Sequence, residues 1–174
     1  MGRNLNLDCP AHGTGSAWWR SLEQERKRLI ESDRIAVLQA VARTMRKGPD
    51  ALPLRVLACG SRSFADAVRV ESVVGTISAV MHKRLVVITG AARGADTLAG
   101  TAARRLGLEV IEYPANWTLH GKAAGPIRNQ QMLVEGKPHL VVAFDARGSG
   151  TSDMVGRARK SDVVICEIRV SDSC

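Results

Sequence analysis

Short continuous runs of apolar residues alternate with segments of helical spacing along the last two thirds of the chain. The apolar runs lie at residues 55–59, 85–89, 109–113, 139–144 and 162–170. The helical patterns lie at residues 66–81, 95–106, 126–135 and 151–160. Continuous Val, Ile and Leu runs separated by helices are typical of a mostly parallel sheet covered by helices on both faces. The sequence therefore predicts a Rossmann-like α/β fold.

A different pattern precedes this alternation. Leu22, Leu29 and Ile30 fall near helical spacing, and a second amphipathic pattern begins at Ile35 after Ser32–Asp33. We expect two short helices with a break at Ser32–Asp33. The Gly-Pro pair that follows Lys47 is a plausible linker, because Gly ends helices and Pro stops their continuation. This predicts a helical extension at residues 1–50 and a Rossmann-like domain at residues 51–174. The apolar stripes of the extension would cover the sheet or pair two subunits as a homodimer.

Composition narrows the class of protein. The formal charge of +8 favours an anionic partner, which could be a nucleotide, a nucleic acid or an acidic protein. The aromatic fraction of 3% is low for a surface that stacks successive bases. Four cysteines without close paired spacing fit a reduced cytoplasmic protein, and no apolar run suggests a signal peptide or a membrane span. Cys9 and His12 alone do not complete a metal site, so we expect no metal, and the sequence demands no cofactor.

Three Gly-rich loops follow predicted strands and lead into predicted helices. Because the carboxyl ends of parallel strands meet at one edge of the sheet, these loops should share a crevice. Small residues there would let backbone N–H groups at a helix start approach a phosphate, and the arginines would add charged donors. Asp96 would accept from a ribose hydroxyl or cap its helix. The candidate ligand-binding residues in these loops are Gly60, Ser61, Arg62, Gly90, Arg93, Gly94, Asp96, Gly148, Gly150 and Thr151.

A long connection between the third strand and the next helix carries further candidates. It contains Trp117 and His120, and we select Lys122, Arg128 and Asn129 as ligand-binding residues. Long loops in compact domains are often functional, and an arginine near a helix start suits bidentate phosphate recognition. The alternative is that Trp117 plugs the edge of the domain while the cations are solvated. Neither a P-loop nor a Gly-x-Ser-x-Gly nucleophile elbow occurs, which weakens NTPase and serine-hydrolase interpretations.

As an ordered set, these motifs resemble the YspA/YpsA-related branch of the SLOG superfamily. The resemblance spans residues 54–160 and rests on Gly60-Ser61-Arg62, residues 90–96, Gly125-Pro126-Ile127-Arg128-Asn129-Gln130-Gln131-Met132 and Gly150-Thr151. It implies a Rossmann-like fold that binds nucleotides or nucleotide-derived ligands. It implies nothing about residues 1–50.

The same superfamily includes the "lonely guy" phosphoribohydrolases, which cleave the N-glycosidic bond of nucleoside monophosphates. Arg128 matches the arginine of their Arg-Lys-x-x-Met segment. Their second motif closes on a glutamate, and this sequence places Met154 there, with Asp153 one position earlier. Glycosidic chemistry needs such a carboxylate. We take Arg128 and Asp153 as the catalytic candidates of this resemblance, with the difference that one position along a helix changes the direction of a side chain by about 100°.

Three functional hypotheses remain open. The favoured one is a protein that senses or sequesters a nucleotide-type small molecule in a crevice at the carboxyl ends of the strands. The alternative is a hydrolase or transferase acting on the ribosyl bond of a nucleotide, with Arg128 positioning the phosphate and Asp153 supplying the carboxylate. The second alternative is nucleic-acid binding, because the DNA-processing protein A family shares the superfamily's core and the chain is basic.

Overall fold

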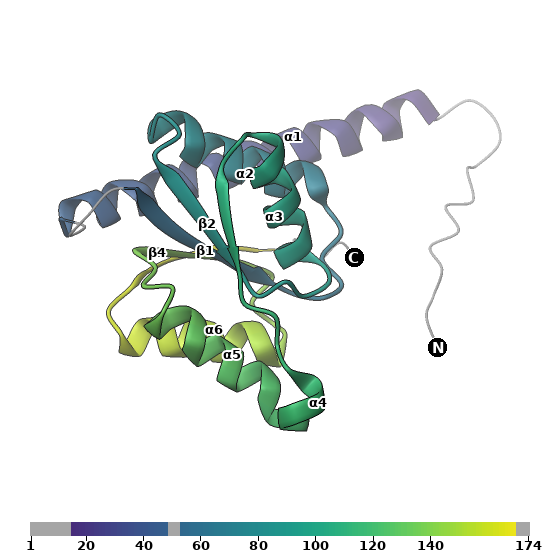
Figure 1. Cartoon of the computed structure of the whole chain (residues 1–174). Coiled ribbons are helices and arrows are strands. Elements are labelled where there is room, and N and C mark those ends of the chain that lie inside the picture. Colours follow the sequence, from purple (N-terminus) through teal and green to yellow (C-terminus); the bar gives the residue numbers. More distant parts are fainter. Residues whose placement is uncertain (1–14, 49–52, 170–174) are drawn as a thin grey trace.

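Five parallel strands form one sheet in the order β3-β2-β1-β4-β5 in the computed structural model, which describes residues 15–48 and 53–169. The strands are β1 (Leu54–Gly60), β2 (Leu85–Thr89), β3 (Glu109–Glu112), β4 (Leu140–Phe144) and β5 (Val164–Ile168). In the register, Val56 of β1 lies between Val87 of β2 and Leu140 of β4. Figure 1 shows the strands side by side at the centre of the molecule. The predicted Rossmann-like α/β fold is confirmed, and every described strand of the sheet is parallel.

Helices connect the strands and cover both faces of the sheet (Figure 1). They are α1 (Gly15–Arg46), α2 (Ala67–Val80), α3 (Ala95–Arg105), α4 (Trp117–His120), the short 3-10 helix η1 (Gly121–Ala123), α5 (Ala124–Val134) and α6 (Ser149–Lys160). The predicted positions of the five strands and of α2, α3, α5 and α6 agree with these bounds to within two residues. The long connection after β3 is not an irregular loop throughout, because α4 and η1 lie within it.

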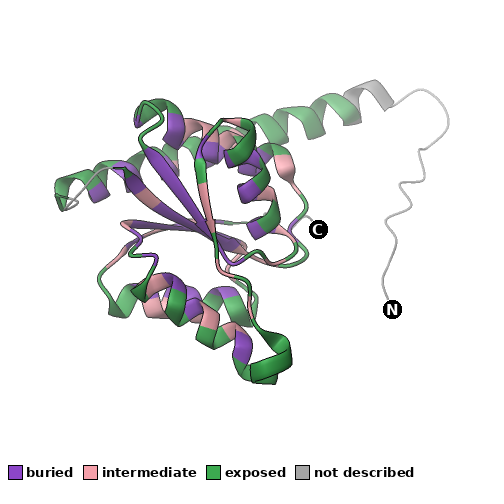
Figure 2. Ribbon diagram, viewed as in Figure 1, coloured by how far each residue is buried: buried purple, intermediate pink, exposed green. Residues whose placement is uncertain are grey.

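The core has two layers, one on each side of the sheet. Val56 and Ala58 of β1 pack under α1, α2 and α3, whereas Leu57 and Cys59 pack under α5 and α6. Successive residues of a strand face opposite sides, so a strand buried on both faces needs a continuous apolar run. Figure 2 shows this as buried residues filling the strands and the helix faces turned toward them.

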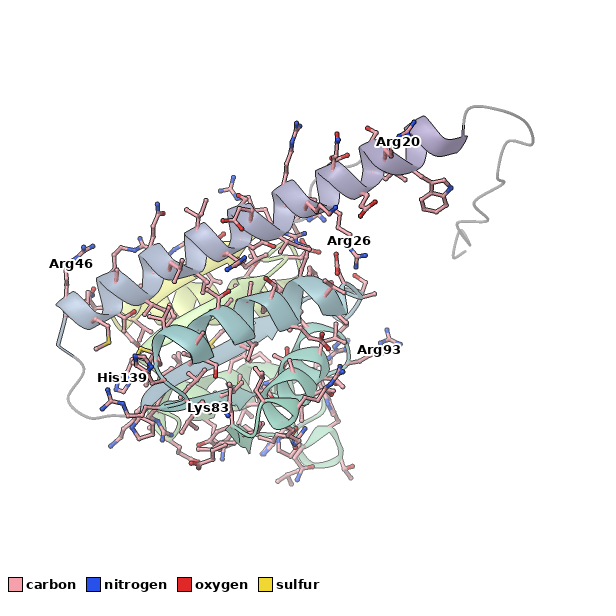
Figure 3. All side chains as sticks on the ribbon, turned by 90° about the horizontal axis from the view of Figure 1, so that it is seen from above. Arg20, Arg26, Arg46, Lys83, Arg93 and His139 are labelled. Carbon is pink, nitrogen blue, oxygen red and sulfur yellow. The ribbon has the colours of Figure 1, made fainter. Side chains whose placement is uncertain are left out.

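The N-terminal region forms one continuous helix, so the prediction of two helices with a break at Ser32–Asp33 is wrong. Asp33 is buried and turns its carboxylate toward the interior instead of capping a new helix. The half of α1 that follows it covers the sheet beside α2 and over β5, through Val37, Ala40 and Val41. The half before it, exposed from Trp19 to Arg28, extends past the body of the molecule (Figures 1 and 3).

A buried ion pair joins α1 to α2. Asp33 accepts from Arg69 Nε at 2.6 Å and from Arg69 Nη2 at 2.9 Å, and Arg69 also donates to the carbonyl of Arg169 beyond β5 at 2.8 Å. The two side chains are only 8% and 4% exposed. The C-terminal half of α1 is therefore part of the packed core, and a domain boundary at residue 50, outside the described residues, stays a prediction.

Candidate functional site

A crevice lies where the strand order reverses, between the carboxyl ends of β1 and β4. After β1 the chain moves outward to β2 and β3, and then crosses back to add β4 and β5 on the other side of β1. The loops that follow β1 and β4 thus lead away in opposite directions and leave a gap between them. This gap has a volume of about 590 Å³. A volume of several hundred cubic ångströms suits a small-molecule ligand.

The crevice brings together nearly all of the residues that the sequence singled out. Its lining includes Gly60, Ser61, Arg62, Arg93, Asp96, Lys122, Arg128, Asn129, Gly148, Gly150, Thr151 and Asp153. Their contact with a ligand stays a prediction, but their gathering from four separate loops into one place is a fact of the fold. Gly90 and Gly94 are the two candidates outside this lining.

Gly94 and Gly90 do not line the crevice but leave space for residues that do. Gly94 has a φ of +86°, and a Cβ there would collide with the backbone of Ser61 and Arg62, so glycine lets the loops after β1 and β2 pack together. Gly90 lines an adjoining hollow of about 540 Å³, which shares Arg62, Arg128 and other residues with the crevice. A Cβ at Gly90 would collide with the guanidinium of Arg128.

Arg128 is held in one position by three neighbours. Its Nη1 donates to the carbonyl of Gly90 at 2.6 Å and lies 3.7 Å from Oδ2 of Asp96, while its Nε donates to Oδ1 of Asn129 at 3.0 Å. A guanidinium carries five N–H donors, so these bonds leave several for an anion. The side chain is fixed before any ligand arrives, which reduces the entropy lost on binding.

Asp96 supports Arg128 from within the protein. Its carboxylate is nearly buried and accepts from the N–H of Gly90 at 3.0 Å. This bond ties the loop before α3, so Asp96 does not cap the first turn of that helix; Gly94 occupies the N-cap position. Burial raises the pKa of Asp96, although Arg128 and backbone N–H groups oppose the increase. A contact between Asp96 and a ribose stays a prediction.

Asn129 extends the network to Asp153. The Nδ2 of Asn129 donates to the carbonyl of Gly150 at 3.0 Å and to Oδ2 of Asp153 at 2.9 Å. Arg157 donates to the same Oδ2 at 2.8 Å. Partial burial raises the pKa of Asp153, but the hydrogen bonds from Arg157 and Asn129 outweigh it, so the pKa lies below the ordinary value of 3.8. Asp153 is therefore a carboxylate at neutral pH and cannot serve as a proton donor.

Asp153 reaches the crevice although it stands one position before the place of the glutamate in the phosphoribohydrolase motif. Met154, which takes the place of the phosphoribohydrolase glutamate, is fully buried in the core beneath α6. Asp153 lines the crevice. The carboxylate one position earlier on the helix thus reaches the crevice, while the matching position faces the sheet.

The starts of α3 and α6 differ in what they offer to an anion. In α3, the N–H groups of Ala95 and Thr97 donate to the carbonyls of Ser61 and Ala92, so much of this helix start is already satisfied. None of the described hydrogen bonds uses the N–H groups of residues 149–151 in the first turn of α6. A helix start with open N–H groups attracts negative charge. The structure therefore favours α6 over α3 as the anion-facing helix.

Cationic and aromatic side chains form the rim of the crevice. The guanidinium of Arg62 lies over the ring of Trp117 at 5.3 Å from its centre, and Arg93 and Lys122 are exposed nearby. Trp117 is 48% exposed, so the interpretation that it plugs the edge of the domain is wrong. Its stacking on Arg62 instead leaves a flat surface at the mouth of the crevice.

Several lining residues were not among the candidates selected from the sequence. They are Cys59, Ser63, Ala92, Trp117, Gly125, Pro126 and Ser149. Ser63 and Ser149 could have been found as polar neighbours of selected residues. The hydroxyl of Ser63 lies 2.7 Å from that of Ser61, and Ser149 is the first residue of α6, between Gly148 and Gly150. Nothing in the apolar run around Cys59 marks it. Burial raises the pKa of its thiol far above the ordinary range, so Cys59 does not provide a thiolate nucleophile.

The part of the chain that the structure describes contains neither a metal-binding cluster nor a membrane-spanning helix. No group of three or more His, Cys, Asp or Glu side chains lies in a position to hold a metal ion there. Cys9 and His12 lie outside the described residues. No helix at residues 15–48 or 53–169 is long and apolar enough to cross a bilayer.

If the crevice binds a nucleotide, alanine at Gly90 is expected to weaken the affinity for it by at least about tenfold, roughly the value of one charge-assisted hydrogen bond. The new Cβ would displace the guanidinium of Arg128 from its fixed position. Isothermal titration calorimetry with the nucleotides described below measures the effect. Gly75→Ala is the matched control, because a Cβ at Gly75 meets nothing. Wild-type affinity in Gly90→Ala would show that the position of Arg128 does not matter for binding.

Two comparisons of the sequence with known proteins indicate the family of the chain. A sequence model of the YspA, cpYpsA-related SLOG family matches residues 54–120. The gene 61 protein of Mycobacterium phage D29 is 33% identical over 119 residues, which cover 64% of this chain and 93% of the phage protein. The chain belongs to the YspA, cpYpsA-related SLOG family. The family match covers β1 to α4 and ends before Arg128, so the roles of this arginine and of α6 in the SLOG crevice depend on the contacts described above.

A solved structure supports the Rossmann-like α/β fold independently. The X-ray structure of DNA processing protein A (DprA) from Streptococcus pneumoniae is similar with a TM-score of 0.53 and 22% sequence identity. The similarity covers 64% of this chain and 49% of the DprA chain, so the SLOG chain spans about half the length of that protein. At this identity the comparison shows a common fold.

Proposed function

We propose that this SLOG protein senses or sequesters a nucleotide-type ligand in the crevice between the loops of β1 and β4. The observation that carries the proposal is the fixed guanidinium of Arg128, held by Gly90, Asn129 and Asp96 beside the open start of α6. A phosphate is the anion that matches both features, since it accepts bidentate bonds from arginine and binds at helix N-termini.

The remaining walls of the crevice suit the other parts of a nucleotide. The stacked pair of Arg62 and Trp117 offers a flat surface on which a base can lie. Oδ1 of Asp153 accepts none of the described hydrogen bonds and is available to a ribose hydroxyl. The adjoining hollow, which shares Arg62 and Arg93 with the crevice, gives room for a ligand longer than a mononucleotide.

The direct test is to identify what the purified full chain carries and binds. Mass spectrometry of small molecules released after native purification should detect a nucleotide or nucleotide derivative, because a preorganised phosphate site often retains its ligand. Calorimetry with nucleoside monophosphates, dinucleotides and cyclic nucleotides then ranks the ligands. A protein that carries no nucleotide and binds none of these compounds would refute the proposal.

The alternative activity is hydrolysis of the N-glycosidic bond of a nucleoside monophosphate. It is favoured by one observation, the carboxylate of Asp153 in the same crevice as Arg128. Water would add to C1′ of the ribose as the bond from C1′ to the base nitrogen breaks, yielding ribose phosphate and the free base with the water proton. Asp153 would stabilise the positive charge that develops on the sugar.

The substitution Asp153→Asn distinguishes a hydrolase from a protein that only binds the nucleotide. If the chain is a hydrolase, this substitution should lower the rate of base release by at least about 100-fold, because the anionic stabiliser is lost. If the chain only binds, it should weaken nucleotide affinity by no more than about tenfold, which is roughly one hydrogen bond. Chromatography of products and calorimetry measure the two effects. Base release that survives in Asp153→Asn would exclude the proposed catalytic assignment.

A further inference from the structure

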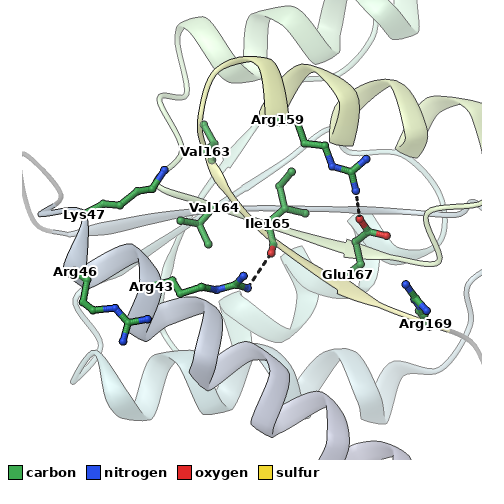
Figure 4. Close-up of a pocket in the computed structure, with 9 residues that line it drawn as sticks. All are labelled: Arg43, Arg46, Lys47, Arg159, Val163, Val164, Ile165, Glu167 and Arg169. Atoms are coloured by element: carbon green, nitrogen blue, oxygen red, sulfur yellow. Dashed lines mark hydrogen bonds and ion pairs between the residues drawn. The ribbon is translucent and has the colours of Figure 1, made fainter.

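A second cavity, which shares no lining residue with the SLOG crevice, runs along the outer edge of the sheet. It has a volume of about 820 Å³ and lies beside β5, between the C-terminal ends of α1 and α6 (Figure 4). Its floor is apolar, formed by Val163, Val164 and Ile165. None of its lining residues lines the crevice.

Five cations from three separate elements surround this groove. Arg43 and Arg46 lie in the last turn of α1 and Lys47 directly after it, Arg159 lies in α6, and Arg169 directly follows β5. Figure 4 shows them distributed along the strand, with Lys47 and Arg169 at opposite ends of the groove.

Neighbouring acids neutralise only part of this charge. Arg159 pairs with Glu167 at 2.6 Å, and Lys47 pairs with Asp162 at 2.7 Å. Within the described residues, the side chains of Arg46 and Arg169 make no hydrogen bond or ion pair. The ends of α1 and α6 contribute about half a negative charge each, so a net excess of about two positive charges remains. The acids and the two helix ends therefore do not balance the five positive charges of the groove.

We infer that this groove binds the phosphodiester backbone of a nucleic acid. The residues from Val163 to Arg169 span about 20 Å at the rise of a parallel strand. One strand of a duplex has a phosphate about every 3.4 Å along the helix axis, and because the strand winds around that axis, only some of the roughly six phosphates over that length face one groove. No aromatic side chain lines the groove in the described part of the chain, so it lacks a surface on which bases stack. The contacts should therefore be to phosphates, and binding should not depend on base sequence.

Two features argue against a second copy of the chain in the groove. Pairing of β5 with β5 would place the same positive clusters opposite each other, which opposes association. The Nη2 of Arg43 already donates to the carbonyl of Ile165 at 3.3 Å, so a cation covers part of the open strand edge.

The test measures binding of the full chain to labelled nucleic acids of about 20 nucleotides or base pairs over a range of salt concentrations. Single-stranded DNA, duplex DNA and duplex RNA are the three probes, and fluorescence anisotropy is the measurement. The groove variant carries Arg46→Gln, Arg159→Gln and Arg169→Gln. We expect its affinity to fall at least about tenfold for the preferred probe and its salt slope to decrease by roughly two to three, one for each lost phosphate contact.

A control variant with the same charge change tests the position of the effect. It carries Lys83→Gln, Arg84→Gln and Arg104→Gln on the other half of the sheet, and Arg104, like Arg159, is ion-paired, with Glu112 at 2.7 Å. We expect its affinity to stay within about twofold of the unmodified chain, because these residues lie far from the groove in the sheet order. The double variant Arg46→Gln and Arg169→Gln, which breaks no described ion pair, should reproduce part of the loss.

Three outcomes would overturn the inference. One is an equal loss of affinity in the groove and control variants, and another is no measurable binding of any nucleic acid at low salt. The third is binding of polyglutamate in place of nucleic acid, which would identify an acidic protein as the occupant. Nucleotide titrations of the groove variant keep this test separate from the proposed function, because its crevice residues are unchanged.

Discussion

Replacing Asp33 by alanine is expected to lower the free energy of unfolding by about 3–5 kcal/mol. The carboxylate is buried between α1 and α2 and accepts two hydrogen bonds from Arg69, at 2.6 Å and 2.9 Å. Removing it leaves a guanidinium that is 4% exposed without its counter-charge. Because small proteins have a total stability of about 5–15 kcal/mol, this is a large fraction of it. Urea denaturation followed by circular dichroism measures the change.

Two further variants distinguish an unpaired buried charge from a general effect of altering α1. Glu31→Ala removes the exposed pair with Arg34 on the same helix and should cost no more than about 0.5 kcal/mol. Asp33→Leu combined with Arg69→Met removes both charges and should recover most of the stability lost in Asp33→Ala. A loss below about 1 kcal/mol in Asp33→Ala would contradict a structural role for the pair.

Replacing Arg128 by methionine is expected to weaken nucleotide binding by about 100-fold or more. The guanidinium would offer two charge-assisted hydrogen bonds to a phosphate, each contributing about 1.5–3 kcal/mol. Methionine retains an unbranched, flexible side chain but donates no hydrogen bond. Calorimetry with the tightest nucleotide from the ligand panel measures the loss. Unchanged affinity would remove Arg128 from the proposed phosphate site.

Loss of Arg128 also removes the positive neighbour of buried Asp96, so stability must be measured alongside binding. The pKa of Asp96 is already raised by burial and should rise further without Arg128. Adding Asp96→Asn to Arg128→Met should restore stability without restoring affinity. Arg104→Met repeats the substitution on an exposed arginine that pairs with Glu112 and should leave nucleotide binding unchanged.

Much of the fold and part of the crevice could be predicted from local patterns. Apolar runs such as 85–89 are strands because a strand buried on both faces must be apolar throughout, and that signal needs no tertiary information. Glycines followed by Arg62 and Arg93 at strand ends indicated the crevice for a similar reason, since parallel strands place their carboxyl ends together. Arg128 required a further inference, because it arrives from a long connection.

The failures arose where a side chain's direction depends on distant residues. Asp33 is a residue type that often begins a new helix, so it predicted a break. It lies inside a continuous helix, where Arg69, 36 positions away, donates hydrogen bonds to its buried carboxylate. The groove along β5 had no sequence signal either. Its cations fall into two groups, at residues 43–47 and 159–169, that are more than 100 residues apart, and only packing of α1 against β5 brings the groups together.

The sequence by itself determined the five strands and the helices α2, α3, α5 and α6, since periodicity and turn chemistry act over a few residues. It also determined that Gly- and Arg-rich loops would gather at one edge of a parallel sheet. Only the tertiary structure decided that Asp153, and not Met154, faces the crevice, and that the start of α6 is open while that of α3 is closed. The physical reason is that a side chain's direction and an N–H group's partner depend on neighbours that folding supplies.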